Sequence, residues 1–210
     1  MSVTAVNLSR MSVTVNGRMG AMGRWQPDSR GRLQEAALAL YSERGFDQTT
    51  AAQIAARAGL TERTFFRHFA DKREVLFGGS ALLQERIVAG VAGAPATDGA
   101  LDAVSVGLDA AAAMLGESRR DLALQRQAVL IANPELRERE LAKLADYAAT
   151  IADTLRQRGV PEPQATLAAE SGMAVLRVAM QRWASGEDSR ELNVIMRDAV
   201  AELRTVTASG

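Results

Sequence analysis

The sequence predicts an all-α protein built from a small N-terminal helical unit and a larger C-terminal helical unit. Apolar residues recur at helical spacing over nearly the whole chain from Pro27 onward, and no stretch shows the alternation of a strand. Glycine and proline interrupt this pattern at intervals that suit helices of ordinary length. Two very short helices separated by a glycine turn are expected in the first third of the chain. Together these observations define the fold class.

Residues 1–24 are the first segment, and we expect a disordered basic arm there. They contain three arginines and no acidic residue, and they follow neither a helical nor a strand period. Methionines that leave the native start open stand at Met1, Met11, Met19 and Met22.

The next elements are a helix that ends at Gly45 and two short helices. Apolar residues of the first helix lie at i, i+3, i+4, i+7 and i+8, beginning with Leu33. Thr50 is placed to cap a second helix that runs to Arg57, and Thr61 is placed to cap a third from Glu62 to about Phe69. A fourth helix is expected to begin after Asp71 and to run to about Val91.

Residues 93–99, with the sequence GAPATDG, give the strongest linker signal in the chain and are expected to divide it into its two parts. Beyond them the apolar spacing predicts five helices, at about residues 100–116, 119–132, 135–158, 163–185 and 189–206. Asn133-Pro134, Gly159, Pro161, Pro163 and Gly186 supply the breaks.

The composition excludes several classes of protein. Apolar residues make up 47%, which is ordinary for a globular chain, and no apolar run approaches the roughly 18 residues of a membrane span. We therefore expect a cytoplasmic protein. There is no cysteine and one histidine, His68, so we expect no disulfide, no metal site, no catalytic residues and no cofactor. The formal net charge is zero, but residues 1–80 carry 11 Lys and Arg against 7 Asp and Glu, and residues 81–210 carry 14 against 18.

The chemistry of the chain is concentrated in residues 49–77. Ile54, Ala55 and Ala58 give the second helix one buried face, and Phe65 and Phe69 anchor the third helix at i and i+4. Small polar and basic side chains are then left on the outer side of the third helix: Thr61, Glu62, Arg63, Thr64, Arg67 and His68. A rigidly anchored short helix with such a face suits the major groove of DNA.

This segment resembles the TetR family of bacterial regulators. The resemblance covers residues 27–80, where ERGFDQTT is followed by IAARAGLTERTFFRHFADKREVL. It implies a three-helix DNA-binding head at residues 25–75, and a ligand-binding and dimerisation domain at residues 76–210. It also implies that Thr50 contacts a phosphate, that Gln53 lies near the groove and that Lys72 contacts a phosphate. The basic arm at residues 1–24 is a further candidate for phosphate contact.

In the third helix the resemblance places Glu62, Arg63 and Thr64 nearest the base edges, and Phe66 and His68 near the DNA backbone. The family usually has tyrosine where this chain has Phe66, so a hydroxyl that commonly reaches a phosphate is absent. We expect Arg63 to read a guanine, because its fork matches the O6 and N7 acceptors. The alternative is that Arg63 and Arg67 are solvated surface charges.

The last two predicted helices carry wide apolar stripes, which suit a four-helix interface with a second subunit, as the family dimerises. The expected interface residues are Val175, Ala179, Trp183, Leu192, Ile195, Met196 and Ala199. The alternative is that both stripes pack on their own subunit. A homodimer would read two half-sites about 34–36 Å apart, so its partner is expected to be a near-palindromic operator in double-stranded DNA.

An effector site is expected among apolar residues of the C-terminal part. The candidate lining is Met114, Arg126, Gln127, Leu130, Tyr147, Met173 and Arg177. It suits an unidentified hydrophobic or amphipathic small molecule, and the alternative is plain core packing. We therefore expect a ligand-released repressor. A ligand-independent or activating regulator is the alternative, and an all-helical enzyme is disfavoured by the lack of reactive groups.

Overall fold

The computed structural model describes residues 29–116, 119–186 and 188–208, and every element within these ranges is helical, as predicted. The predicted arm at residues 1–24 lies outside the described residues. The elements are α1 (Ser29–Arg44), α2 (Ala51–Arg57), α3 (Glu62–His68), the 3-10 helix η1 (Glu74–Phe77), α4 (Ser80–Gly93), α5 (Ala100–Leu115), α6 (Arg120–Ala132), α7 (Pro134–Gln157), α8 (Gln164–Ser185) and α9 (Leu192–Ala208).

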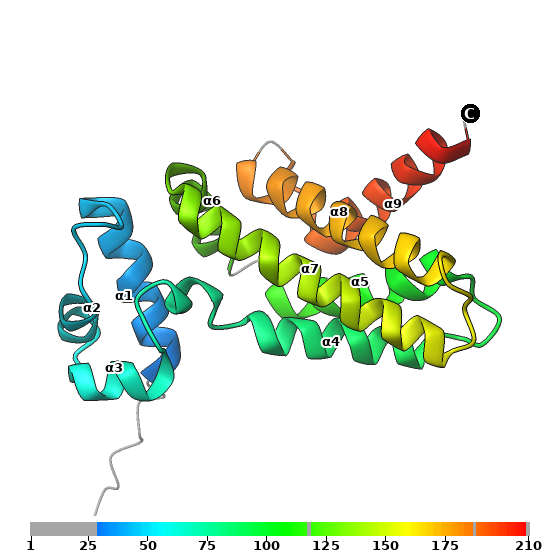
Figure 1. Ribbon diagram of the computed structural model, residues 1–210. Helices are drawn as coiled ribbons and strands as arrows, with labels where there is room; N and C mark the ends of the chain where they lie inside the picture. Colours follow the sequence, from blue (N-terminus) through cyan, green and yellow to red (C-terminus); the bar gives the residue numbers. More distant parts are fainter. Residues whose placement is uncertain (1–28, 117–118, 187, 209–210) are drawn as a thin grey trace, which may run out of the picture.

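The described chain forms a head and a body, which η1 and α4 join (Figure 1). The head contains α1, α2, α3 and η1, and its core includes Leu33, Ile54 and Phe65, each with no exposed surface. The body core is made by α4, α5, α7, α8 and α9. Leu130 of α6 and Leu136 of α7 are buried in the head core, so the body contributes directly to the packing of the head.

The predicted fourth helix is wrong at its start. The Asp71 carboxylate accepts hydrogen bonds from the backbone N–H groups of Arg73 and Glu74, at 2.8 and 3.1 Å, and begins the short turn η1 instead. The chain then bends at Gly78, where a Cβ atom would lie 2.8 Å from Phe69 Cε1. A side chain here would force Phe69 to shift, and α4 starts two residues later, at Ser80.

The predicted linker at residues 93–99 is a turn within the body and does not separate two units. The helices on either side of it pack so closely that a Cβ on Gly90 would lie 2.7 Å from the Cα of Gly107. Arg158, directly after α7, holds the turn by donating hydrogen bonds to the carbonyls of Ala94 and Pro95, at 2.8 and 2.7 Å. The boundary between head and body therefore lies earlier in the chain, near Gly78.

One stretch, Glu74–Gly93, has the length and composition of a membrane-crossing helix. A single such stretch is weak evidence, since helices of soluble proteins pass the same test. Here it is interrupted by the turn at Gly78 and carries exposed Glu85 and Arg86.

Candidate nucleic-acid interface

Helix α2 is fixed at its start by reciprocal capping. The Thr50 hydroxyl accepts a 3.2 Å hydrogen bond from the backbone N–H of Gln53, and the Gln53 side-chain oxygen accepts a 2.9 Å bond from the N–H of Thr50. Both residues are exposed, as predicted, but the Gln53 oxygen is engaged in the cap. Its amide NH2 group and the second lone pair of that oxygen remain available to a partner.

Helix α3 is set by a second cap and by two phenylalanines. Gly59 (φ +66°) makes the turn after α2, and the Thr61 hydroxyl then accepts a 3.2 Å hydrogen bond from the N–H of Thr64. Phe65 has no exposed surface and Phe69 is 3% exposed, so their side of α3 is sealed against the head core. A seven-residue helix held in this way presents its other face in a fixed orientation.

That outer face carries most of the predicted DNA-binding residues. Glu62, Arg63, Phe66 and Arg67 are all exposed, whereas Thr64 and His68 are half-buried. The Nε2 atom of His68 is buried and has no hydrogen-bond partner among the described residues. The structure therefore brings the predicted α3 residues together on one surface, with His68 at its margin.

Two of the unpaired cations of the head, Arg63 and Arg67, lie on this face. Arg57 is tied to Glu43 at 2.6 Å, and its hydrogen bond lowers the pKa of that carboxyl. Arg73 is likewise paired with Asp71, at 2.8 Å. Within the described residues Arg63 and Arg67 have no ion-pair partner. The cations of α3 are thus free to meet phosphates or base edges.

Lys72, predicted to contact a phosphate, is engaged within the head in this structure. Its ammonium group donates hydrogen bonds to the carbonyls of Phe46, Asp47 and Thr49, at 2.8, 3.3 and 3.1 Å, and lies 4.2 Å from the centre of the Phe46 ring. All three of its donors are used inside the head. The Tyr41 hydroxyl, whose pKa is raised by burial, fixes the same residue through a 2.5 Å bond to the Lys72 carbonyl. Lys72 therefore holds the loop between α1 and α2.

One basic residue near this surface was not predicted from the sequence. Arg30 is exposed in the first turn of α1, and its guanidinium group lies 5.3 Å from the centre of the Phe69 ring, at the end of α3. The first turn of α1 contains no acidic residue, although acidic residues are favoured there. An arginine at the start of a helix is unfavourable, and this was the signal in the sequence that could have identified Arg30.

The structure divides the predicted effector-site residues among the head core, the body core and the surface. Leu130 lies in the head core and Met173 in the body core, while Arg177 is exposed on α8. The Tyr147 hydroxyl donates a 2.7 Å hydrogen bond to the carbonyl of Ser80. The remaining members are half-buried: Met114, Arg126 and Gln127. Most of these residues pack in a core or at the head–body junction. Core packing was the alternative to an effector site that the sequence left open.

Arg126 lies at this junction. Its Nε donates a 3.0 Å hydrogen bond to the carbonyl of Leu76 in η1, and its guanidinium group forms a 2.9 Å ion pair with Glu140 of α7. The same guanidinium group lies 5.4 Å from the centre of the Phe77 ring. Arg126 therefore connects the end of the head to two body helices.

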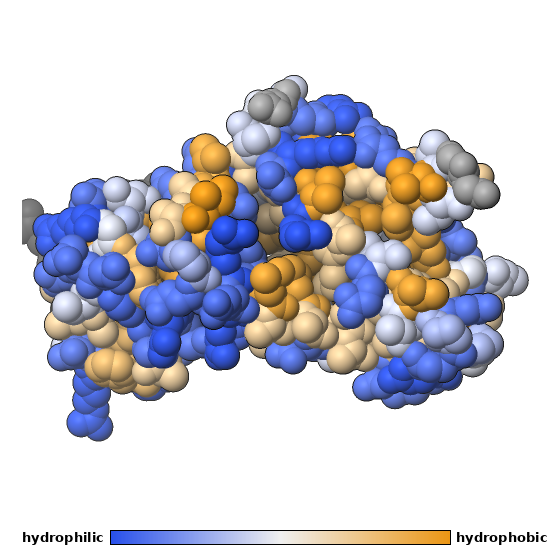
Figure 2. Space-filling view, turned by 45° about the horizontal axis from the view of Figure 1, so that its top comes forward, coloured by the Kyte–Doolittle hydropathy of each residue, from blue (hydrophilic) through white to orange (hydrophobic). Residues whose placement is uncertain are grey.

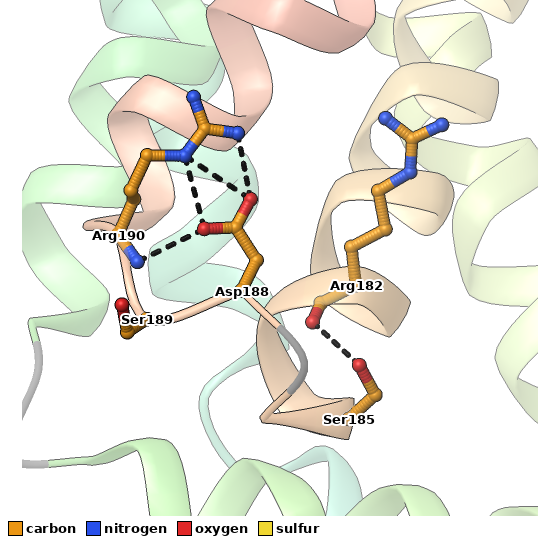
Figure 3. Close-up of a pocket in the computed structure, with 5 residues that line it drawn as sticks. All are labelled: Arg182, Ser185, Asp188, Ser189 and Arg190. Atoms are coloured by element: carbon orange, nitrogen blue, oxygen red, sulfur yellow. Dashed lines mark hydrogen bonds and ion pairs between the residues drawn. The ribbon is translucent and has the colours of Figure 1, made fainter.

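Two surface hollows lie elsewhere. One, of about 500 Å³, is open between the end of α8 and the start of α9, and it is lined by Arg182, Ser185, Asp188, Ser189 and Arg190 (Figure 3). Arg190 folds back on Asp188 at 2.7 Å and lowers the pKa of that carboxyl to about 2, while Arg182 is paired with Glu202 at 2.8 Å. The other, of about 280 Å³, lies between α1 and α2. The described residues contain no cluster suited to a metal ion.

The predicted dimer-interface residues lie on the buried sides of α8 and α9. All seven are buried within their own subunit, and Ala179 and Trp183 have no exposed surface at all. The burial of these stripes was predicted correctly, but they pack on their own subunit. Helix α8 has a second stripe at helical spacing whose members are exposed or half-buried: Leu167, Ser171, Ala174, Val178 and Gln181. The strongly apolar surface patches in Figure 2 lie over the body, whereas the head is mainly hydrophilic on that face.

Comparison with known proteins gives matches over both parts of the chain. Residues 33–77 match the model described as bacterial regulatory proteins, tetR family, and residues 98–208 match the model of the MftR C-terminal domain. A curated relative, the HTH-type transcriptional regulator TcmR of Streptomyces glaucescens, is 36% identical over 120 residues. That match covers 57% of this chain and 52% of TcmR, so the chain spans about half the length of this relative.

Solved structures show the same fold. The transcriptional regulator FadR from Bacillus subtilis, in complex with stearoyl-CoA, superposes with a TM-score of 0.57 at 19% identity, over 81% of this chain and 95% of that one. The SmeT–triclosan complex superposes with a TM-score of 0.58 at 18% identity, over 84% and 91% of the two chains.

Proposed function

Since the chain belongs to the TetR family of bacterial transcriptional regulators, we propose that it is a homodimeric repressor that a small molecule releases from a near-palindromic operator. The observation that carries this proposal is the outer face of α3. Its unpaired Arg63 and Arg67 stand on a helix that the Thr61 cap and two buried phenylalanines, Phe65 and Phe69, hold in place. Non-enzymatic, cytoplasmic action on DNA follows from this proposal.

The dimer is proposed to form through the outer stripe of α8, defined above by Leu167 to Gln181. Val178 is 37% exposed and Leu167 is 63% exposed, and no described residue covers them. Val178→Glu should shift the dimer towards monomer in sedimentation equilibrium, because it places like charges near the two-fold axis. Leu82→Glu changes a 49% exposed residue of α4 and should leave the dimer intact. Equal behaviour of the two variants would contradict this interface.

The effector is proposed to be a hydrophobic or amphipathic small molecule. FadR and SmeT are seen with stearoyl-CoA, which joins a long apolar chain to a charged nucleotide, and with triclosan, and the body core of this chain is lined mainly by apolar side chains. That core is closely packed, so we propose that the ligand separates its helices and selects a second conformer. The same close packing favours a second candidate, a regulator that works without ligand.

Polar contacts along α7 support a route from body to head. Glu74 of η1 is paired with Arg139 at 2.7 Å and with Lys143 at 3.4 Å. Further along, Gln84 of α4 donates a 2.7 Å hydrogen bond to the Thr150 hydroxyl. We propose that η1, α4 and α7 move together, so that a displacement of α7 changes the spacing of the two heads.

The test is selection of duplexes from a random pool by the full-length protein at fixed salt. A near-palindrome should emerge, and Arg63→Ala should relax one symmetric position, with a loss of about 1–3 kcal/mol of base discrimination in each half-site. Arg86→Ala removes an exposed arginine of α4 and should leave the selected sequence unchanged. Failure to enrich any sequence at moderate salt would refute the specific regulator.

A further inference from the structure

Phe66 is the large apolar side chain that the described part of the head exposes to solvent. Its side chain is 54% exposed, and every other strongly exposed large apolar residue described lies in the body. The exposed ring stands on the outer face of α3, beside Arg63 and Arg67. Helices α2 and α3 lie at the opposite end of the molecule from α9, so the body does not cover this face (Figure 1).

The ring is held in place from beneath. It meets Phe65 edge to face, with 5.3 Å between ring centres and 82° between ring planes, and Phe65 has no exposed surface. Phe66 therefore presents an apolar surface in a fixed orientation to any molecule that binds this face. Such a surface gains little from a phosphate, because the phenyl group has no hydroxyl to donate and would displace the water around a charge.

One apolar group is available on the base edges of the major groove, the C5-methyl of thymine. We propose that Phe66 contacts this methyl group and so selects a thymine in each half-site. This inference rests on the proposed operator function and assigns a base contact to a residue for which the family resemblance implies a backbone contact.

The position of the thymine follows from the helix. Arg63 and Phe66 stand at i and i+3, so their Cβ atoms are about 5–6 Å apart. Because base pairs are spaced by about 3.4 Å, the thymine lies one or two pairs from the guanine that Arg63 reads.

The experiment uses the selected operator and the full-length protein at fixed salt. Each thymine is replaced by deoxyuridine, one symmetric pair at a time, which removes only the methyl group, and affinity is measured by fluorescence anisotropy. Removal of one buried methyl group changes an equilibrium constant about fourfold, so the pair that Phe66 contacts should lower affinity roughly fifteenfold. Phe66→Ala should bind the thymine and deoxyuridine operators equally, Phe66→Leu should retain part of the difference, and Leu82→Ala should retain all of it.

Three results would overturn the inference. If no thymine pair shows a methyl effect while Phe66→Ala still weakens binding, the ring acts on the sugar–phosphate backbone, and the operator function stands. If a methyl effect exists but persists in Phe66→Ala, another residue makes the contact. If no operator is selected at all, the proposed function fails, and the thymine contact fails with it.

Discussion

Replacement of Lys72 by methionine separates a structural role from DNA contact. Methionine keeps an apolar stem of similar length but removes three hydrogen bonds of 2.8, 3.1 and 3.3 Å to the loop between α1 and α2. A hydrogen bond to a charged group is worth about 1.5–3 kcal/mol when buried. Lys72 is only half-buried and its carbonyl partners can regain water, so we expect a total loss of about 2 kcal/mol.

The assay has two readouts. Urea unfolding at fixed protomer concentration should show a lower midpoint with an unchanged slope. The dependence of log affinity on log salt should keep its slope, because each phosphate contact contributes about 0.9 and we expect Lys72, with its donors used inside the head, to make none. Arg67→Ala is the matched control: it removes an unpaired, exposed cation and should lower the slope by up to about 1.8 per dimer while the urea midpoint stays the same.

The structural role of Lys72 would be refuted by the opposite pattern. An unchanged urea midpoint, together with a salt slope reduced by about 1.8 per dimer, would mean that the ammonium group leaves the loop and contacts phosphate in the complex.

Three further predictions concern packing, pH and the head–body junction. Gly107→Ala places a Cβ 2.6 Å from a backbone carbonyl oxygen of α4. It should destabilise the fold by about 2 kcal/mol, which lowers the melting temperature by roughly 4–8 °C. The control is Gly93→Ala, whose added Cβ has no atom within 4 Å and which should be neutral or slightly stabilising. An unchanged melting temperature in Gly107→Ala would contradict the close approach of α4 and α5. Arg190 holds the pKa of Asp188 at about 2, below its ordinary value of 3.8. This pair therefore stabilises the fold above pH 4 and loses its contribution as the pH falls towards 2. Asp188→Asn should flatten that part of an acid titration followed by circular dichroism. Arg126→Gln removes a half-buried ion pair and a hydrogen bond to η1. A loss of about 1 kcal/mol of local stability should speed amide exchange in η1 roughly fivefold in hydrogen-exchange mass spectrometry. Unchanged exchange would show that η1 is held by other contacts.

Local signals in the sequence determined the helices and the head. The caps at Thr50 and Thr61 and the turn at Gly59 depend on atoms within a few residues, so the ends of these helices can be predicted from the local sequence alone. For the same reason the C-terminal helices, α5 to α9, begin and end within three residues of their predicted positions. The outward face of α3 also followed from sequence, because burying Phe65 and Phe69 leaves one orientation for the helix.

Tertiary structure decided what each side chain touches. The apolar stripe through Trp183 predicted burial correctly, yet periodicity does not say which surface does the burying, and the partner is the subunit's own core. Lys72 meets carbonyls 23 to 26 residues earlier in the chain, and Arg126 meets one 50 residues earlier. Leu130 joined the core of the head, not an effector site, for the same reason. Capping and periodicity are set by near neighbours, whereas these contacts exist only once distant segments are packed together.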